Sequence, residues 1–295
     1  MALILSVLEQ GMIYGILALG VYITYKILDF PDLTVDGSFP FGAAITARLI
    51  SGLGVPAILT LPVSFLAGAL VGMCTGLIHV KLKVRDLLCG IIMMTGLYTI
   101  NLWVAGSAYV PIFNKENIFD NSFVNQLFPK SLQSFKVVII VFLITMVAKY
   151  LLDWYMKTKS GFLLRAAGDN DTIVTSLGVD KGLVKIVGLS IANGLVSLSG
   201  CIYAQQQRSF EISIGTGAVV IGLASVIIGT SLFKKMRFLH VTSSVLIGSI
   251  LYKACVALAM FAGVDATAIK LITAVLFLVI LVISMDRGKK RGTVC

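Results

Sequence analysis

Nine long apolar stretches follow one another along this chain and leave little between them. They cover residues 3–27, 36–54, 57–80, 86–107, 135–156, 184–206, 215–233, 240–262 and 267–285. A helix needs about 20 apolar residues to cross a bilayer, and a soluble core cannot bury a chain that is 58% hydrophobic and 13% charged. The sequence therefore predicts an all-α, polytopic membrane protein with about nine transmembrane or re-entrant helices in one domain over residues 1–295.

Two of these stretches are interrupted by residues that helices disfavour. The second follows the run Asp29-Phe-Pro-Asp-Leu-Thr-Val-Asp36 and carries Gly37, Pro40 and Gly42, and the seventh begins at Ile214-Gly-Thr-Gly217. Irregular backbone at membrane depth is tolerated only where protein or a water-filled cavity surrounds it. We therefore expect either stretch to be a half-helix or a re-entrant element.

The basic residues set the orientation. The net charge is +10, but the Lys and Arg residues cluster in short loops between apolar stretches, which argues against nucleic-acid binding. With the loop 157–183 in the cytoplasm, 17 of the 24 basic residues lie on the cytoplasmic side, as the positive-inside rule requires. The N-terminus and the loop 108–134 are then external. That loop is either a plain connector or a contact for a soluble partner.

The loop 157–183 is a polar island that contains the signals of a short helix. Asp169, Asn170 and Asp171 are residues that cap and favour a helix N-terminus, and Gly178 is placed for a left-handed C-cap. Three apolar residues fall on one face between them: Ile173, Val174 and Leu177. A short one-sided helix outside the membrane predicts a docking surface for a partner.

A few polar side chains fall inside the apolar stretches, where they are costly and usually face the bundle interior or a water-filled path. The candidates for a translocation path, with one neighbouring aromatic residue, are Asp36, Ser38, Phe39, Asn101, Asn193 and Ser197. Asn193 either lines a path or joins two helices by a hydrogen bond. Asp36 either begins a broken helix near the midplane or caps a helix at the membrane surface.

Small residues recur every four positions at Gly68, Gly72 and Gly76, at Gly11 and Gly15, and at Ser225 and Gly229. Such stripes allow close helix packing, either inside the chain or, as the less favoured interpretation, between two copies.

Catalytic and metal-binding motifs are missing from the sequence. It contains no GxxxxGK[ST], HExxH or GxSxG run and no paired acids within an apolar stretch, and its five cysteines are scattered. We therefore predict that the chain has no cofactor, no metal site and no enzymatic activity of its own.

Three stretches resemble permeases of the branched-chain amino acid type of ABC importer. The first is Gly161-Phe-Leu-Leu-Arg-Ala-Ala-Gly-Asp-Asn170 with Thr175-Ser-Leu-Gly-Val179, the second is Ile27–Ala43, and the third is Ile221–Gly229. The sequence departs from the usual pattern at Asp29 and Pro31. In this respect it is closer to a subgroup that pairs with lipoprotein-type binding proteins, which leaves the solute open.

The resemblance implies a multi-pass permease in a bacterial cell membrane. Two copies of the chain would form a homodimer, two ATP-binding subunits would dock on the cytoplasmic face, and an external binding protein would deliver an amino acid or a related compound. The ATPase-coupling residues would be Arg165, Asp169, Asn170, Ile173, Val174 and Leu177. The alternatives are a stand-alone secondary transporter or channel and, with little support from the residues, a membrane-embedded enzyme.

Overall fold

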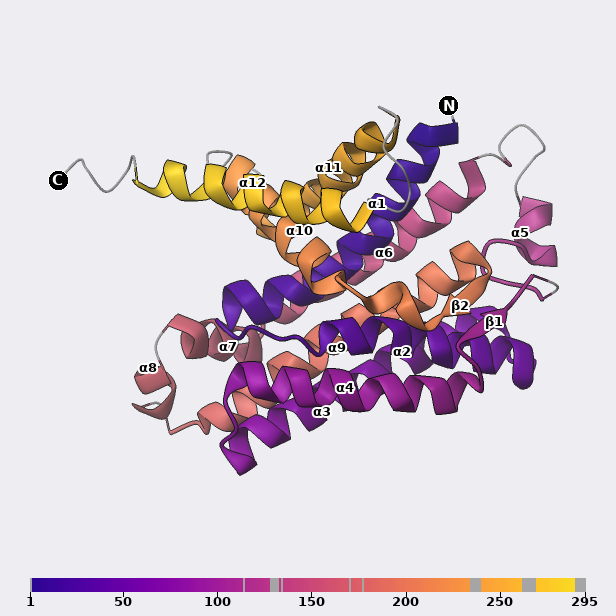
Figure 1. Ribbon diagram of the computed structural model, residues 1–295. Helices are drawn as coiled ribbons and strands as arrows, with labels where there is room; N and C mark the ends of the chain where they lie inside the picture. Colours follow the sequence, from indigo (N-terminus) through magenta and orange to yellow (C-terminus); the bar gives the residue numbers. More distant parts are fainter. Residues whose placement is uncertain are drawn as a thin grey trace.

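Helices make up nearly all of the computed structural model, which describes residues 2–113, 115–127, 133, 135–169, 171–176, 178–233, 240–261 and 269–289 (Figure 1). The helical elements are α1 (Ala2–Val21), η1 (Tyr22–Ile27), α2 (Val35–Ala47), η2 (Arg48–Gly52), η3 (Ala57–Leu59), α3 (Thr60–Leu82), α4 (Asp86–Ala105), α5 (Ser122–Leu127), α6 (Lys136–Met156), α7 (Lys159–Asp169), α8 (Asp171–Ser176), α9 (Lys181–Gln207), η5 (Ile212–Gly215), α10 (Ala218–Leu232), α11 (Val241–Phe261) and α12 (Ile269–Lys289). Among the described residues, seven helices are long and apolar enough to cross a membrane. The predicted all-α membrane fold is confirmed, and the count of about nine holds approximately.

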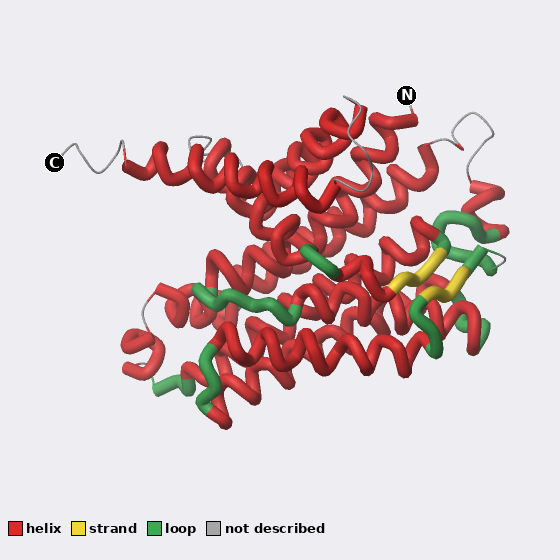
Figure 2. Tube along the Cα trace, viewed as in Figure 1, coloured by secondary structure: helices red, strands yellow, loops and turns green. Residues whose placement is uncertain are grey.

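The second predicted stretch is a helix that begins after a break. Helix α2 has 13 residues and continues directly into the five residues of η2, so together they span about 27 Å at 1.5 Å per residue, and they are not among the seven candidate spans. Residues 28–34 before it are not helical and run as a loop between η1 and α2 (Figure 2). The seventh stretch keeps a 3₁₀ turn, η5, ahead of the 15 residues of α10.

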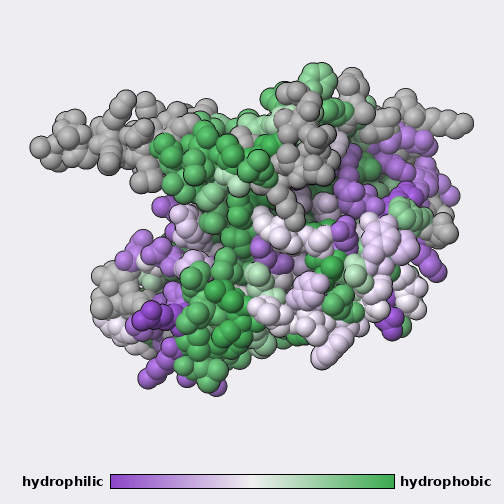
Figure 3. Space-filling view, viewed as in Figure 1, coloured by the Kyte–Doolittle hydropathy of each residue, from purple (hydrophilic) through white to green (hydrophobic). Residues whose placement is uncertain are grey.

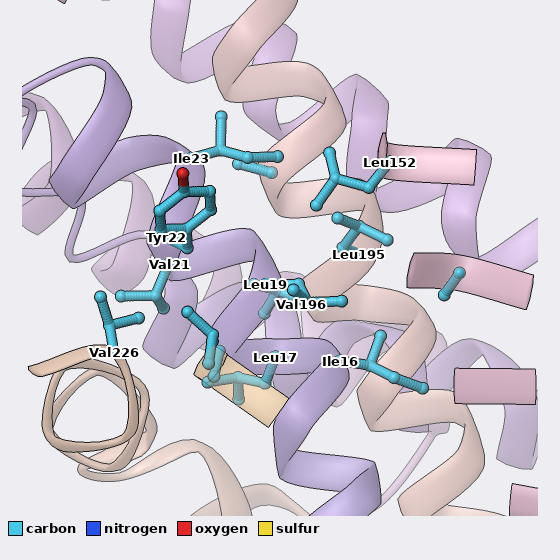
Figure 4. Close-up of a cluster of buried hydrophobic side chains, with 14 of the residues drawn as sticks. Ile16, Leu17, Leu19, Val21, Tyr22, Ile23, Leu152, Leu195, Val196 and Val226 are labelled. Carbon is cyan, nitrogen blue, oxygen red and sulfur yellow. The ribbon is translucent and has the colours of Figure 1, made fainter. Parts of the chain in front are cut away.

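Helix α9 lies at the centre of the bundle and packs against α1, α2 and α3. In the most apolar stretch of α9, 72% of the residues are buried, whereas the corresponding fraction in α4 is 22%. Helix α4 therefore lies at the periphery. A second group, α10 and α11, packs against α1 on its other side. Figure 4 shows the side chains where these groups meet, with Leu17 and Leu19 of α1 near Val196 of α9.

Glycines bring the backbones of α3 and α9 into contact. A Cβ at Gly72 would overlap the Leu189 carbonyl and lie 2.8 Å from the Cα of Ser190, and one at Gly76 would lie 2.9 Å from the Cα of Ile186. Gly68 meets α9 in the same way, and Gly11 and Gly229 meet α11. These stripes therefore serve internal packing, as the favoured interpretation predicts.

The two ends of the bundle differ in structure. Helices α7 and α8 lie at one end, which we call the α8 end, and the antiparallel pair β1 (Tyr109–Pro111) and β2 (Ser209–Glu211) lies at the other, the sheet end (Figure 1). Hydrophilic residues gather toward both ends, and apolar ones cover the α3–α4 face between them (Figure 3).

The segment 108–134 is more than a plain connector. Its strand β1 pairs with β2, and its Asp120 carboxylate lies 2.8 Å from the guanidinium of Arg208. Hydrogen bonds from Asn125 and Arg208 lower the pKa of Asp120 below its ordinary value, so this carboxylate stays ionised near neutral pH.

Because α3 and α9 touch through glycines, a Gly→Ala substitution in this contact should destabilise the protein, whereas the same substitution on α4 should not. Gly72→Ala adds a methyl group against backbone that cannot move aside, and overpacking of this kind costs about 1–3 kcal/mol. Gly96→Ala on α4 is the control, because its Cβ meets nothing within 4 Å and alanine favours a helix. We expect the thermal unfolding temperature of the purified protein to fall only for Gly72→Ala. Equal unfolding temperatures for the two variants would contradict the close contact.

Candidate functional site

A buried carboxylate organises the non-helical segment before α2. Asp32 is 5% exposed and accepts hydrogen bonds from the backbone N–H of Thr34 at 2.9 Å and from Nδ2 of Asn193 at 2.8 Å. The Ser38 hydroxyl donates to Oδ1 of the same Asn193 at 2.6 Å. We call Asp32, Thr34, Ser38 and Asn193 the buried clasp, because it ties the segment 28–34 and α2 to the central helix α9.

The buried clasp answers one question that the sequence left open. Asn193 joins α9 to α2, as the interhelical interpretation expects, and it is fully buried. Asp32 was missed by the sequence analysis, which considered Asp36 alone. A signal for it existed, because an acidic residue flanked by apolar stretches is costly and usually has a specific partner.

Asp36 caps a helix other than its own. Its carboxylate accepts hydrogen bonds from the backbone N–H groups of Gly217 at 3.1 Å and Val219 at 2.8 Å. These groups open α10, whose first-turn N–H groups have no partner within the helix. A carboxylate at this end is also favoured by the helix dipole. Asp36 thus fixes the start of α10 against α2. Neither predicted alternative, the start of a broken helix or a cap at the membrane surface, described this role.

The other path candidates are packed rather than open to water. Ser197 donates to the carbonyl of Ser64 at 2.8 Å, and Asn101 donates to the carbonyl of Gly37 at 3.1 Å. Phe39 stacks on Tyr14 with ring centroids 5.6 Å apart. All three are fully buried. The structure brings these residues together around α2, and in this conformation they hold helices to one another.

The polar island forms two helices instead of one. Helix α8 occupies the predicted place and is followed by Gly178 in the left-handed conformation, with φ +72°, as the sequence predicts. The 11 residues of α7 before it were not predicted. Arg165 and Asp169 are exposed on α7, where a partner can reach them.

The predicted apolar docking face is wrong at Val174, which is fully buried and belongs to the main hydrophobic core. Periodicity alone could not tell which side of α8 faces the bundle, and Val174 faces inward because the core removes it from water. Ile173 lies in α8, but its side chain lies outside the described part, as do Asn170 and Leu177.

Helix α7 is seated on the segment that leads to α2. A Cβ at Gly168 would overlap the Ile27 carbonyl oxygen, so the two backbones touch. Leu164 is fully buried and packs together with Leu28 over Gly188 of α9. We call this contact the α7 joint, and it connects the exposed α8 end directly to the start of the non-helical segment 28–34.

The capping role of Asp36 predicts a local change. Asp36→Ala removes the acceptor from the first turn of α10, and losing a cap costs about 1 kcal/mol. We expect faster hydrogen–deuterium exchange in the peptide that contains Gly217–Val219. Asp180→Ala is the control, because Asp180 accepts a hydrogen bond from Gly182 N in the first turn of α9, and it should accelerate exchange there instead. Unchanged exchange at Gly217–Val219 in Asp36→Ala would refute the cap.

Comparison with known proteins places this arrangement in a family. The family described as "Branched-chain amino acid transport system / permease component" matches residues 3–285. The tyrosine transport system permease protein of Clostridioides difficile (strain R20291) is 40% identical over 94% of this chain and 90% of its own length. No solved structure matches.

Two more distant relatives have other solutes in their names. The probable branched-chain amino acid transport permease protein LivH of Methanocaldococcus jannaschii is 28% identical over 73% of this chain and 70% of its own length. The ribose import permease protein RbsC of Haemophilus influenzae is 26% identical over 77% and 68%, respectively. The chain therefore belongs to the branched-chain amino acid transport permease family and is a multi-pass bacterial membrane protein.

Proposed function

We propose that this chain is the membrane-spanning subunit of an ATP-driven importer for an amino acid. The α8 end faces the cytoplasm and binds ATPase subunits, and the sheet end faces a binding protein that delivers the solute. A second copy of the chain completes the permease. The observation that carries the proposal is the α7 joint, since it links an exposed surface to the broken helix α2.

The sequence itself supports a separate motor. It has no P-loop, the Gly-rich loop that cradles nucleotide phosphates in many ATPases, so ATP hydrolysis would fall to other subunits. Relatives named for tyrosine and for branched-chain amino acids support an amino acid as the solute, and the tyrosine permease has the higher identity to this chain.

The docking surface lies on α7 rather than on the apolar side of α8. Phe162 is 60% exposed on α7, and Arg165 and Asp169 are exposed on the same helix. Aromatic residues and Arg are enriched at the centres of protein interfaces, and Phe162 and Arg165 are both exposed on α7. A push on this surface would move the segment 28–34 through the α7 joint and so displace α2 from its contacts with α9.

Uptake by purified components tests the function. We expect proteoliposomes containing this chain, its ATPase subunits and its binding protein to accumulate radiolabelled L-tyrosine or L-leucine. Accumulation should require ATP on the side of the membrane to which the ATPase subunits bind. Omitting the ATPase should abolish accumulation. Uptake driven by an ion gradient through this chain alone would instead establish a secondary transporter, and uptake of ribose in preference to every amino acid would overturn the assigned solute class.

Charge reversal tests the docking surface. Arg165→Glu should weaken co-purification of the ATPase subunits by about tenfold, as loss of an interfacial ion pair does. Lys157→Glu is the matched control, because Lys157 is also exposed at the α8 end and the charge change is the same. Equal recovery of ATPase with both variants would show that α7 does not dock it.

A further inference from the structure

A pocket at the sheet end is lined by charges of both signs. Its volume is about 200 Å³, and it lies among residues of α1, α6, the last turn of α9 and the segment 108–134. The lining residues that matter are Glu9, Phe119, Lys136, Val137, Gln206 and Arg208. A cavity of about 150 Å³ is enough to hold benzene, so this one can hold a small organic molecule.

The pocket lining offers hydrogen-bond acceptors. Gln206 donates through Nε2 to the Glu9 carboxylate at 3.1 Å, which fixes the amide orientation, since the flipped amide would set two oxygens against each other. The Glu9 carboxylate is thereby held at the pocket lining as a hydrogen-bond acceptor, and an ammonium group provides three donors.

Two cations also line the pocket. Arg208 lies 2.8 Å and Lys136 lies 3.6 Å from the carboxylate of Asp120, so one negative charge is shared by two positive charges and a net charge of +1 remains. Glu9 forms no ion pair with either cation in the described part of the chain. The charges of Glu9, Asp120, Lys136 and Arg208 therefore sum to zero, and the acidic and basic groups that line the pocket are not paired with each other.

We infer that this pocket binds the zwitterionic head of a free amino acid. The ammonium group meets Glu9, the carboxylate meets Lys136 and Arg208, and the side chain lies against Phe119 and Val137. A plain anion would be repelled by Glu9, and a plain cation by Lys136 and Arg208. The inference rests on the proposed function, because the sheet end is where the solute would arrive.

Binding to the chain in lipid nanodiscs, without ATPase or binding protein, tests the site. We expect saturable binding of radiolabelled L-alanine and L-tyrosine, competed by unlabelled alanine but not by ethylamine or propionate, each of which lacks one charged group. Glu9→Gln and Lys136→Gln should each weaken binding by about tenfold or more, because each removes a charge-assisted hydrogen bond. Glu211→Gln and Lys115→Gln are matched controls, because both residues are exposed near the same end and neither is among the residues that line the pocket.

The outcomes separate this site from the function itself. Wild-type affinity in both pocket variants, or no saturable binding by the wild-type chain, overturns the site even if the full transporter imports amino acids. In the full transporter, a raised KM for uptake in Glu9→Gln supports the site, and a KM equal to that of the wild-type transporter overturns it. Absence of ATP-driven amino acid uptake by the wild-type transporter overturns the proposed function, whatever the nanodiscs bind.

Discussion

The non-helical segment 28–34 imposes the constraint on which much of this bundle depends. Lipid offers no hydrogen bonds, so irregular backbone at membrane depth must be enclosed by protein. The buried clasp meets this need with Asp32 and Asn193, and Asn101 adds a bond to the Gly37 carbonyl. The glycine contact between α3 and α9 then closes the bundle around the clasp. The break and the start of α2 are thus held by side chains from α4 and α9.

The same break joins the two ends of the molecule. At the α8 end, Gly168 and Leu164 rest on Ile27 and Leu28, the last residue of η1 and the first residue of the non-helical segment. Farther along, α2 contacts η5, and Asp36 caps α10. Packed contacts of this kind transmit displacement because interiors are dense and deform little. A displacement of α7 would therefore reach α2 and α10 through only a few residue contacts.

Sequence reasoning found what repeats and missed what depends on tertiary contacts. Apolar stretches located the spanning helices, and the spacing of Gly68, Gly72 and Gly76 predicted a packing seam, because both signals are local. The prediction that Val174 lies on an exposed docking face was wrong, because its burial is decided by the bundle. Asp36 was noticed as a polar residue at depth, but its partners Gly217 and Val219 lie 181 and 183 residues away. No local pattern indicates such a pairing.

Spin labels follow the α7 joint through the transport cycle. One label replaces Lys159 at the start of α7 and the other replaces Lys26 in η1, both exposed positions, in a cysteine-free chain bound to its ATPase subunits. Double electron–electron resonance then measures the distance between the labels in two states. One state has no nucleotide, and the other has ADP and vanadate trapped after ATP hydrolysis. If α7 and the end of η1 move as one body, the distance distribution is the same in both states of a labelled transporter that still takes up its solute. A shift of several ångströms (on the order of one helical turn) would show that α7 slides past η1, and the joint could not carry the coupling.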